Sequence, residues 1–427
     1  MVKILHFSDA HIDMVRQGRR DPHSGLPLRT LDFLSALDSI VDAAVEQHVD
    51  LVIFAGDTYR DRNPAPTFQR EWGKRIVRLS QAGIFTVMVV GNHDVSPAIG
   101  RAHAMQEYQT LQIQNTYVIS KPCFLKPQDL NGLPIQMIGL PWLSRSGMMA
   151  YYEMQHTSLK DLNLEMEEML SELIRTWLAE LDHELPTILT SHVTVQGALY
   201  GNERSVMLGR DMVISPALFK DERLDYVALG HIHKYQDLNK GHYPPVVYPG
   251  SIERVDFGEI NDTKGYVIAE VEKGSTTYQF HKLEGRKYIS IEIEIKEKDD
   301  ITRQVINKLP ALEVIENAIF RVVLSYPRKW EALIDERAIR EYGEKAFEFY
   351  LVRHPHVESR VLLPDSISLS QLSALDLLDV YWKSIHVEPD QAQKLNSIAA
   401  EIIHLSDMGG SPDELLAHLI ENEEGQE

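Results

Sequence analysis

Residues 3–11 read KILHFSDAH, a short apolar run that ends in a cluster of polar side chains. A continuous apolar run of this length is typical of a β-strand that is buried on both faces. Similar runs recur along the first part of the chain, and most of them also end in Asp, Asn, Ser or His. They lie at Leu51–Ala55, Phe85–Val90, Ile135–Leu140, Thr187–Thr190, Tyr226–Leu229 and Val246–Tyr248.

Segments with helical periodicity separate these runs. Leu31–Gln47 places its apolar residues on one face, and Pro66–Gln81 and Ser158–Asp182 also follow helical patterns. Strands that alternate with helices predict an α/β fold with layers on both sides of the sheet. Because ligands in such folds bind beyond the carboxyl ends of the strands, the polar clusters lie where a functional site is expected.

The pattern changes near residue 278, so we expect a catalytic domain at 1–278 and a small α+β domain at 279–362. In the second domain, apolar and polar residues alternate, which predicts strands, and two helical patterns lie between them. The predicted β-α-β-α-β unit consists of Lys287–Lys296, Asp300–Leu309, Phe320–Tyr326, Asp335–Lys345 and Phe347–Val352.

The remaining residues, 363–427, are expected to be helical. Apolar residues at helical spacing form one stripe from Leu372 to Ile385 and another from Leu395 to Leu405. A last amphipathic set lies at Leu415–Ile420. Such stripes are more often core than interface, but a helix pair outside two complete domains must bury its apolar face somewhere, either by self-packing or against a partner.

Composition excludes several classes of protein. The 427 residues carry a net charge of −20, which argues against a free-standing nucleic-acid binder but not against an enzyme whose metal ions meet the phosphate. The single cysteine, Cys123, excludes an intramolecular disulfide and a thiolate zinc site. The start of the sequence lacks a signal-peptide pattern, and no stretch approaches the roughly 20 apolar residues of a membrane span, so we expect a cytoplasmic protein.

Five polar clusters at the ends of predicted strands supply oxygen or imidazole ligands. Each cluster is weak evidence alone, and the bland alternative is a set of scattered polar loop residues. Together they suit two metal ions about 3.5–4 Å apart, which activate a water and neutralise phosphate oxygens while a carboxylate bridges them. Such ligands favour manganese, iron or zinc over calcium. The clusters are Asp9-Ala10-His11, Gly56-Asp57, Gly91-Asn92-His93-Asp94, Ser191-His192 and Gly230-His231-Ile232-His233.

In this order, the clusters resemble those of the calcineurin-like metallophosphoesterase superfamily. A second segment, YPGSIERVDFGE at residues 248–259, closely resembles the one that follows the last metal motif in SbcD-type DNA repair exonucleases. Pro141-Trp142 and the stretch from Ser191 to Gly197 are similar to that family too. The resemblance implies a layered αββα sandwich with a small α+β capping domain and C-terminal helices.

The resemblance also implies a role for each candidate site residue. His93 is not a ligand; it stabilises the transition state or protonates the leaving oxygen, and manganese is the implied metal. One metal ion is held by Asp9, His11, Asp57 and His233, and the other by Asp57, Asn92, His192 and His231, so that Asp57 bridges the pair.

Two positions depart from the family pattern. Asp13 stands where members commonly have the Gly of a Leu-Gly pair; it either supports the ligands or is solvated, and we expect it to be solvated. Related enzymes often carry an Asp three residues after the bridging Asp, which can orient the catalytic His. Here that position is Arg60, and Asp61 is the nearest carboxylate, so either the loop shifts by one residue or His93 is oriented differently.

Arg254 lies within the second motif and leaves two interpretations open. It contacts the substrate, or it forms an ion pair with Asp256 that anchors the turn at Gly250.

The leading functional hypothesis is a DNA nuclease subunit, with the 3′→5′ exonuclease and endonuclease activities that the resemblance implies. The implied partners are DNA, an SbcC-type coiled-coil ATPase on which the C-terminal helices dock, and a second copy of the chain. One alternative is a stand-alone phosphodiesterase for small nucleotides or phospholipid headgroups, whose marks would be a closed pocket and activity without a partner. A weakly catalytic scaffold that recruits the ATPase is another, but the intact ligand set argues against it.

Overall fold

The computed structural model describes residues 1–14, 19–95, 102–142, 159–201, 213–356, 373–385 and 387–407. The chain forms two compact units, and each is described by itself. The first comprises Met1–Ser290, Pro310–Arg321 and Gly343–Tyr350, and the second comprises Ile291–Leu309, Val322–Tyr342 and Leu351–Glu427.

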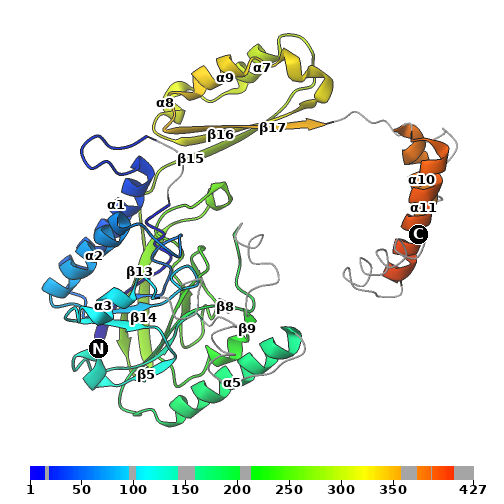
Figure 1. The fold of residues 1–427 in the computed structure, drawn as a ribbon. Helices are drawn as coiled ribbons and strands as arrows, with labels where there is room; N and C mark the ends of the chain where they lie inside the picture. Colours follow the sequence, from blue (N-terminus) through cyan, green and yellow to red (C-terminus); the bar gives the residue numbers. More distant parts are fainter. Residues whose placement is uncertain are drawn as a thin grey trace. The chain divides into compact units, whose positions relative to one another are not determined.

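The first unit contains two six-stranded sheets (Figure 1). In the first sheet, β1 to β4 are parallel neighbours, and β13 joins β1 in antiparallel orientation. Its order is β14-β13-β1-β2-β3-β4. The strands are β14 (Ser275–Lys282), β13 (Gly265–Glu272), β1 (Val2–Phe7), β2 (Leu51–Phe54), β3 (Phe85–Val89) and β4 (Thr116–Ile119).

The second sheet has the order β11-β12-β10-β7-β6-β5. Its four central strands are parallel, and the two edge strands are antiparallel to their neighbours. The strands are β11 (Gln236–Asp237), β12 (Val246–Tyr248), β10 (Tyr226–Gly230), β7 (Thr187–His192), β6 (Gln136–Leu140) and β5 (Cys123–Leu125).

Side-chain alternation along the strands produces four layers. On β1, Ile4 packs in a core that both sheets share, whereas Leu5 and Phe7 pack in a core with α1 (Leu28–Glu46) and α2 (Pro66–Gln81). Helix α5 (Leu159–Ala179) covers the outer face of the second sheet through a third core. The layered αββα sandwich is therefore confirmed.

All seven strand predictions of this region are confirmed to within one residue at each end, except that β7 extends two residues beyond the predicted end at Thr190. The hairpin β13–β14 was not predicted, although β13 extends the first sheet beyond β1. The expected domain boundary after residue 278 falls within β14.

A separate three-stranded sheet has the order β15-β16-β17. Helices lie between its strands in sequence, as the alternation and helical patterns predicted. The elements are β15 (Tyr288–Glu294), α7 (Ile301–Lys308), α8 (Leu312–Ile315), β16 (Ile319–Pro327), α9 (Glu336–Gly343) and β17 (Glu348–His356).

Two helices follow, α10 (Ala374–Ser384) and α11 (Pro389–Asp407). Ser373 caps α10 by accepting the N–H of Asp376, whose carboxylate accepts the N–H of Ser373 in return. The indole of Trp382 donates to Asn396 across the pair at 2.9 Å. Leu372 and the set at Leu415–Ile420 lie outside the described residues. Among the helices that the structure describes, none is long and apolar enough to cross a membrane.

Candidate metal centre

Every predicted ligand lies at or just beyond the carboxyl end of a central strand. Asp9 and His11 follow β1, Asp57 follows β2, and Asn92 follows β3. The other ligands come from the second sheet. His192 ends β7, while His231 and His233 follow β10. The two stacked sheets thus bring ligands from distant parts of the sequence to one shared edge.

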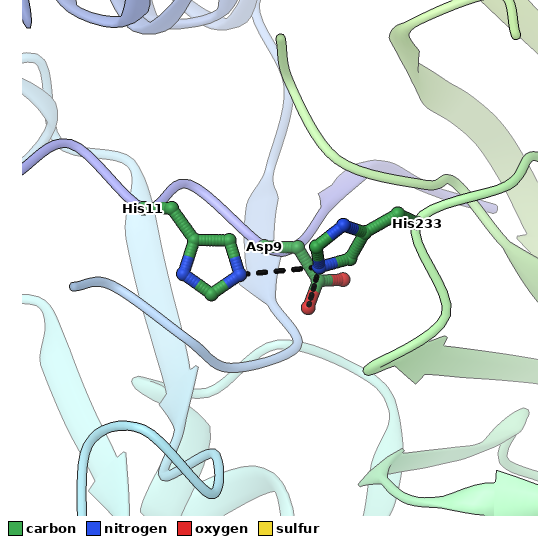
Figure 2. Close-up of side chains that lie close together, drawn as sticks. All are labelled: Asp9, His11 and His233. Carbon is green, nitrogen blue, oxygen red and sulfur yellow. Dashed lines mark hydrogen bonds and ion pairs between the residues drawn. The ribbon is translucent and has the colours of Figure 1, made fainter. Parts of the chain in front are cut away.

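The first group contains Asp9, His11 and His233, whose ligand atoms all lie within 4.8 Å of one another (Figure 2). The Nε2 atoms of the two histidines are 3.2 Å apart, and His233 Nε2 is 3.9 Å from Asp9 Oδ1. Asp9 Oδ1 is buried and has no hydrogen-bond partner among the described residues. A buried carboxylate oxygen without a donor, beside two converging imidazoles, fits a bound cation.

The second group contains Asp57, His192 and His231, again within 4.8 Å of one another. His192 Nε2 lies 3.4 Å from Asp57 Oδ2. The side-chain oxygen of Asn92 lies 3.0 Å from His192 Nε2 and 2.9 Å from His231 Nδ1. Asn92 therefore joins this group, as the resemblance implied.

Asp57 lies between the two groups. Its Oδ2 atom is 3.9 Å from His11 Nε2 in the first group and 3.4 Å from His192 Nε2 in the second. Its Oδ1 atom accepts the backbone N–H of His93 at 2.9 Å. One oxygen facing both groups is what a bridging carboxylate requires, so the ligand set fits a dimetal enzyme.

Four of the ligand residues have left-handed backbone conformations, with φ of 51° at Asp9, 40° at His11, 62° at Asp57 and 97° at His231. Non-glycine residues adopt such angles rarely, at a cost of about 1–3 kcal/mol each, and they cluster at functional sites. Backbone hydrogen bonds hold these loops, such as the one from the Asp9 N–H to the Gly56 carbonyl at 2.9 Å.

Two motif glycines are required by close approach. A Cβ at Gly91 would lie 2.2 Å from Asp57 Oδ1, and a Cβ at Gly56 would lie 2.3 Å from His192 Nδ1. A side chain at either position would displace a ligand. The glycine in each of these sequence motifs therefore belongs to the site, although Gly-Asp at a strand end is usually a simple turn.

The electrostatics of the centre are dominated by burial and by Asp57. Burial lowers the pKa of His11 to about 3. Burial also opposes the charge on His192, but the adjacent Asp57 carboxylate outweighs it and raises the pKa of that imidazole to about 9. Burial likewise disfavours the Asp57 anion, yet the surrounding histidines hold the pKa of this carboxyl well below its usual range.

The ring orientations of three histidine ligands are fixed from behind, two of them by backbone carbonyls. His192 Nδ1 is 2.7 Å from the Ala55 carbonyl, and His11 Nδ1 is 3.2 Å from the Tyr59 carbonyl. These contacts place the proton on Nδ1 and leave Nε2 to bind a metal ion.

His233 has a carboxylate behind it instead. Its Nδ1 lies 2.7 Å from Glu259 Oε1, and the buried Lys264 ammonium lies 2.8 Å from the other oxygen of Glu259. Burial disfavours the Glu259 anion, but His233 and Lys264 lower the pKa of this carboxyl to about 2. The sequence reasoning missed both residues, although Glu259 ends the quoted second motif.

Trp142 also borders the second group, with its ring centroid 5.0 Å from that of His231. The sequence motif at Pro141-Trp142 gave this residue no role.

His93 lies beside the centre, and a backbone carbonyl orients it. Its Nδ1 lies 2.7 Å from the carbonyl oxygen of Arg60. Asp61 does not face it, since its carboxylate accepts the N–H of Asn63 at 2.9 Å. The expectation that Asp13 is solvated is wrong. Asp13 is 8% exposed, and its carboxylate accepts the N–H groups of Arg60 and Asp61.

Arg254 serves as an anchor in the described residues. Its guanidinium donates to the carbonyl of Asp262 at 2.8 Å, and its own carbonyl accepts from Arg29 and from the hydroxyl of Tyr288. Asp256 instead accepts the N–H of Gly258. The expected ion pair between Arg254 and Asp256 is therefore not formed, and backbone groups hold Arg254 instead. Substrate contact by Arg254 stays a prediction.

A family model described as calcineurin-like phosphoesterase matches residues 2–235, which include every predicted ligand. The chain belongs to this family. It is accordingly a metal-dependent hydrolase of phosphoesters.

Solved structures that match this chain include a dimetal phosphatase from Danio rerio, with 10% sequence identity and a TM-score of 0.37. Another is the TT1561 protein of Thermus thermophilus, with 15% identity and a TM-score of 0.36. Each match covers 65% of this chain and 98% of the other chain. Similarities at this level say nothing about the substrate.

Proposed function

We propose that this chain is the nuclease subunit of a DNA end-processing complex, and that it hydrolyses phosphodiester bonds with two manganese ions. The proposed activities are 3′→5′ exonuclease and endonuclease, in DNA repair and recombination. The observation that carries the proposal is the segment at residues 248–259, which resembles SbcD-type nucleases and supplies Glu259 to the back of the ligand His233.

An open groove beside the centre supports a polymeric substrate. The described residues around it enclose about 1090 Å³, and the groove opens to solvent next to His93. Pockets for small ligands are usually closed and measure about 300–1,000 Å³. Arg60 and Arg62 line this groove and can meet phosphates along a strand. A small-nucleotide pocket would be more enclosed.

The metal ligands and His93 have different roles in the proposed hydrolysis. When bound, two metal ions would activate a water and neutralise the oxygens of the scissile phosphate. Asp57 holds the two ligand groups together, and its Oδ1 fixes the backbone of His93. His93 then meets the leaving oxygen and transfers a proton to it.

The C-terminal helices are the proposed contact with an SbcC-type ATPase. Tyr381, Ile385, Ile398 and Ile402 are exposed there among the described residues. Exposed apolar side chains four residues apart on a helix, as at Ile398 and Ile402, are typical of a face that binds a partner helix. A net charge of −20 also favours a partner that supplies the basic, DNA-holding surface.

The test is cleavage of end-labelled linear duplex DNA by the full-length chain with manganese, with and without an SbcC-type ATPase. We expect DNA degradation that Asp57→Ala and His93→Ala abolish. His183→Ala, at an exposed histidine outside the ligand set, is the matched control and should retain activity.

The alternative is a stand-alone phosphodiesterase for small nucleotides or other diesters. If the wild type hydrolyses bis(p-nitrophenyl) phosphate but leaves DNA intact in both conditions, the nuclease proposal fails and the alternative stands. Association with the ATPase is tested by Ile398→Asp with Ile402→Asp, which should weaken binding to its isolated coiled-coil base. Unchanged binding would overturn the proposed docking surface.

A further inference from the structure

We propose that Asp13 is a positioning residue for His93 and acts on it through the backbone of Arg60. The inference rests on the proton-transfer role that the proposed function gives to His93. It concerns phosphodiester hydrolysis in general and does not depend on DNA as the substrate.

Asp13 is a buried carboxylate that, among the described residues, accepts two hydrogen bonds from one loop. Its Oδ1 atom accepts the N–H of Arg60 at 2.5 Å, and its Oδ2 atom accepts the N–H of Asp61 at 3.0 Å. Hydrogen bonds to an ionised acceptor are about twice as strong as neutral ones, so the two bonds hold consecutive peptide groups in place. The Arg60 carbonyl belongs to the same planar peptide group as the Asp61 N–H, so fixing that N–H also fixes the carbonyl.

The Arg60 carbonyl in turn selects the state of the His93 ring. The oxygen lies 2.7 Å from His93 Nδ1, and a carbonyl can only accept, so Nδ1 carries a proton. Nε2 is then the ring nitrogen that faces the reacting groups; it takes a proton from solvent and, as the imidazolium, gives that proton to the leaving oxygen, which leaves the ring neutral with its proton on Nδ1. The Glu259 carboxylate fixes the proton of His233 in the same way, by accepting directly from its Nδ1.

The His93 ring needs a hydrogen bond that fixes its orientation, because little packs around it. The residue is half-buried and lines the groove described above. Its backbone N–H is fixed by Asp57, but that bond leaves the side-chain torsions unrestrained. Among the polar contacts that the structure describes for its ring, the bond to Arg60 is the one that sets the ring's rotation.

A purely structural role for Asp13 is the competing explanation. In that case Asp13 satisfies two amides and holds the loop, and its loss would harm the protein without acting on proton transfer. The two explanations differ in how the effect of the variant depends on the leaving group. They also differ in whether the effect of losing Asp13 disappears when His93 is already absent.

The experiment compares Asp13→Ala with the wild type on two diesters of thymidine, in the full-length chain with manganese. One is the dinucleotide TpT, whose leaving group is an alkoxide, and the other is thymidine 5′-(p-nitrophenyl phosphate), whose leaving group needs no proton. We expect kcat for TpT to fall about 10–100-fold, with KM and manganese affinity by calorimetry unchanged, since general acid catalysis contributes about 10²–10⁴-fold. For the nitrophenyl ester we expect a loss below about 3-fold.

Three further variants complete the test. Asp13→Asn keeps one acceptor and should recover part of the loss, and it replaces Asp13→Ala if that variant does not fold. Asp299→Asn alters an exposed carboxylate outside the groove and should behave as the wild type. Asp13→Ala added to His93→Ala should cost nothing more, because residues that act in series are not additive.

The tautomer of His93 gives a readout that needs no turnover. In ¹⁵N-labelled protein, the His93 ring should show a protonated Nδ1 in the wild type and a mixture of tautomers in Asp13→Ala. The proposal is overturned if both substrates lose activity equally, if the double variant is additive, or if the tautomer does not change. If DNA is not cleaved while both thymidine esters are, the nuclease proposal fails and this one is still decided.

Discussion

The edge of the two sheets that carries the candidate ligands, here called the ligand edge, differs from the C-terminal helices in what it buries. At the ligand edge, polar side chains are at most 2% exposed: Asp9, Asp57, His192 and His231. On the C-terminal helices, apolar side chains are 38 to 44% exposed: Tyr381, Ile385, Ile398 and Ile402. The first region buries polar side chains and the second exposes apolar ones. Both reverse the usual distribution, and each reversal costs free energy unless something binds there. The buried polar groups fit a pair of metal ions. The exposed apolar residues are covered, in our proposal, by another protein.

The largest effect should come from the centre of the ligand edge. Asp57→Ala removes the oxygen that faces both ligand groups and the acceptor of the His93 N–H. We expect kcat for bis(p-nitrophenyl) phosphate to fall by at least about 10³-fold, or about 4 kcal/mol in the barrier. Asp299→Ala, at an exposed aspartate, is the control. Activity within about tenfold of the wild type would refute the bridging role.

A second prediction concerns stability and separates buried from exposed helical stripes. Leu37 on α1 is buried in the core of the first sheet, so Leu37→Ala should lower the free energy of unfolding by about 2–5 kcal/mol. Ile398 on α11 is exposed, so Ile398→Ala should change it by less than about 0.5 kcal/mol. Urea unfolding measures both changes in free energy, and hydrogen exchange recorded at each urea concentration distinguishes the two units. Equal losses would show that the α11 stripe is already covered in the free chain.

A third prediction tests the support behind His233. Glu259→Gln weakens the acceptor for His233 Nδ1 and removes the charge that pairs with Lys264. Replacing such a residue behind a metal-binding histidine typically lowers metal affinity about 10–100-fold. Titration calorimetry with manganese chloride measures the change, and Glu284→Gln, at an exposed glutamate, is the matched control. An affinity equal to that of the wild type would leave Glu259 with a structural role alone.

The smallest effect is a pH dependence of stability in the metal-free protein. Burial opposes the Glu259 anion, but His233 and Lys264 outweigh it and lower the pKa of this carboxyl from 4.5 to about 2 in the folded chain. The resulting stabilisation is therefore complete above about pH 4.5 and is lost as the pH falls toward 2. Glu259→Gln should flatten this part of the curve of unfolding free energy against pH, measured with a chelator present. A curve that keeps its wild-type slope would contradict the assignment.

Most of the fold could be predicted because its signals are local. Each buried strand is a continuous apolar run, as in Leu51–Phe54, and each covering helix has its own periodicity. The hairpin β13–β14 was missed because its outer strand alternates between partly buried and exposed residues and resembles the start of the next domain. Its attachment to β1 joins residues that are more than 260 positions apart in the sequence.

The candidate ligands could likewise be named from the sequence, because ligand chemistry belongs to the side chain. Asp, His and Asn at the ends of strands already specify a metal site for phosphoester hydrolysis, and the structure brings them into two groups. The sequence also contains the motif glycines beside these ligands, but it does not reveal why a glycine is needed there. Their role depends on the distance to a side chain from another strand, as at Gly56 and His192.

The sequence by itself identified the candidate metal ligands and predicted that they lie at the ends of buried strands. Only the tertiary structure decided what holds the site residues in place: Glu259 with Lys264 behind the candidate ligand His233, and behind His93 the Arg60 carbonyl, whose loop is held by Asp13. The physical reason is that a backbone carbonyl is present in every residue and leaves no signature in a sequence. Its role is set by the path of the chain, which brings the loop after β2 against the loop after β3.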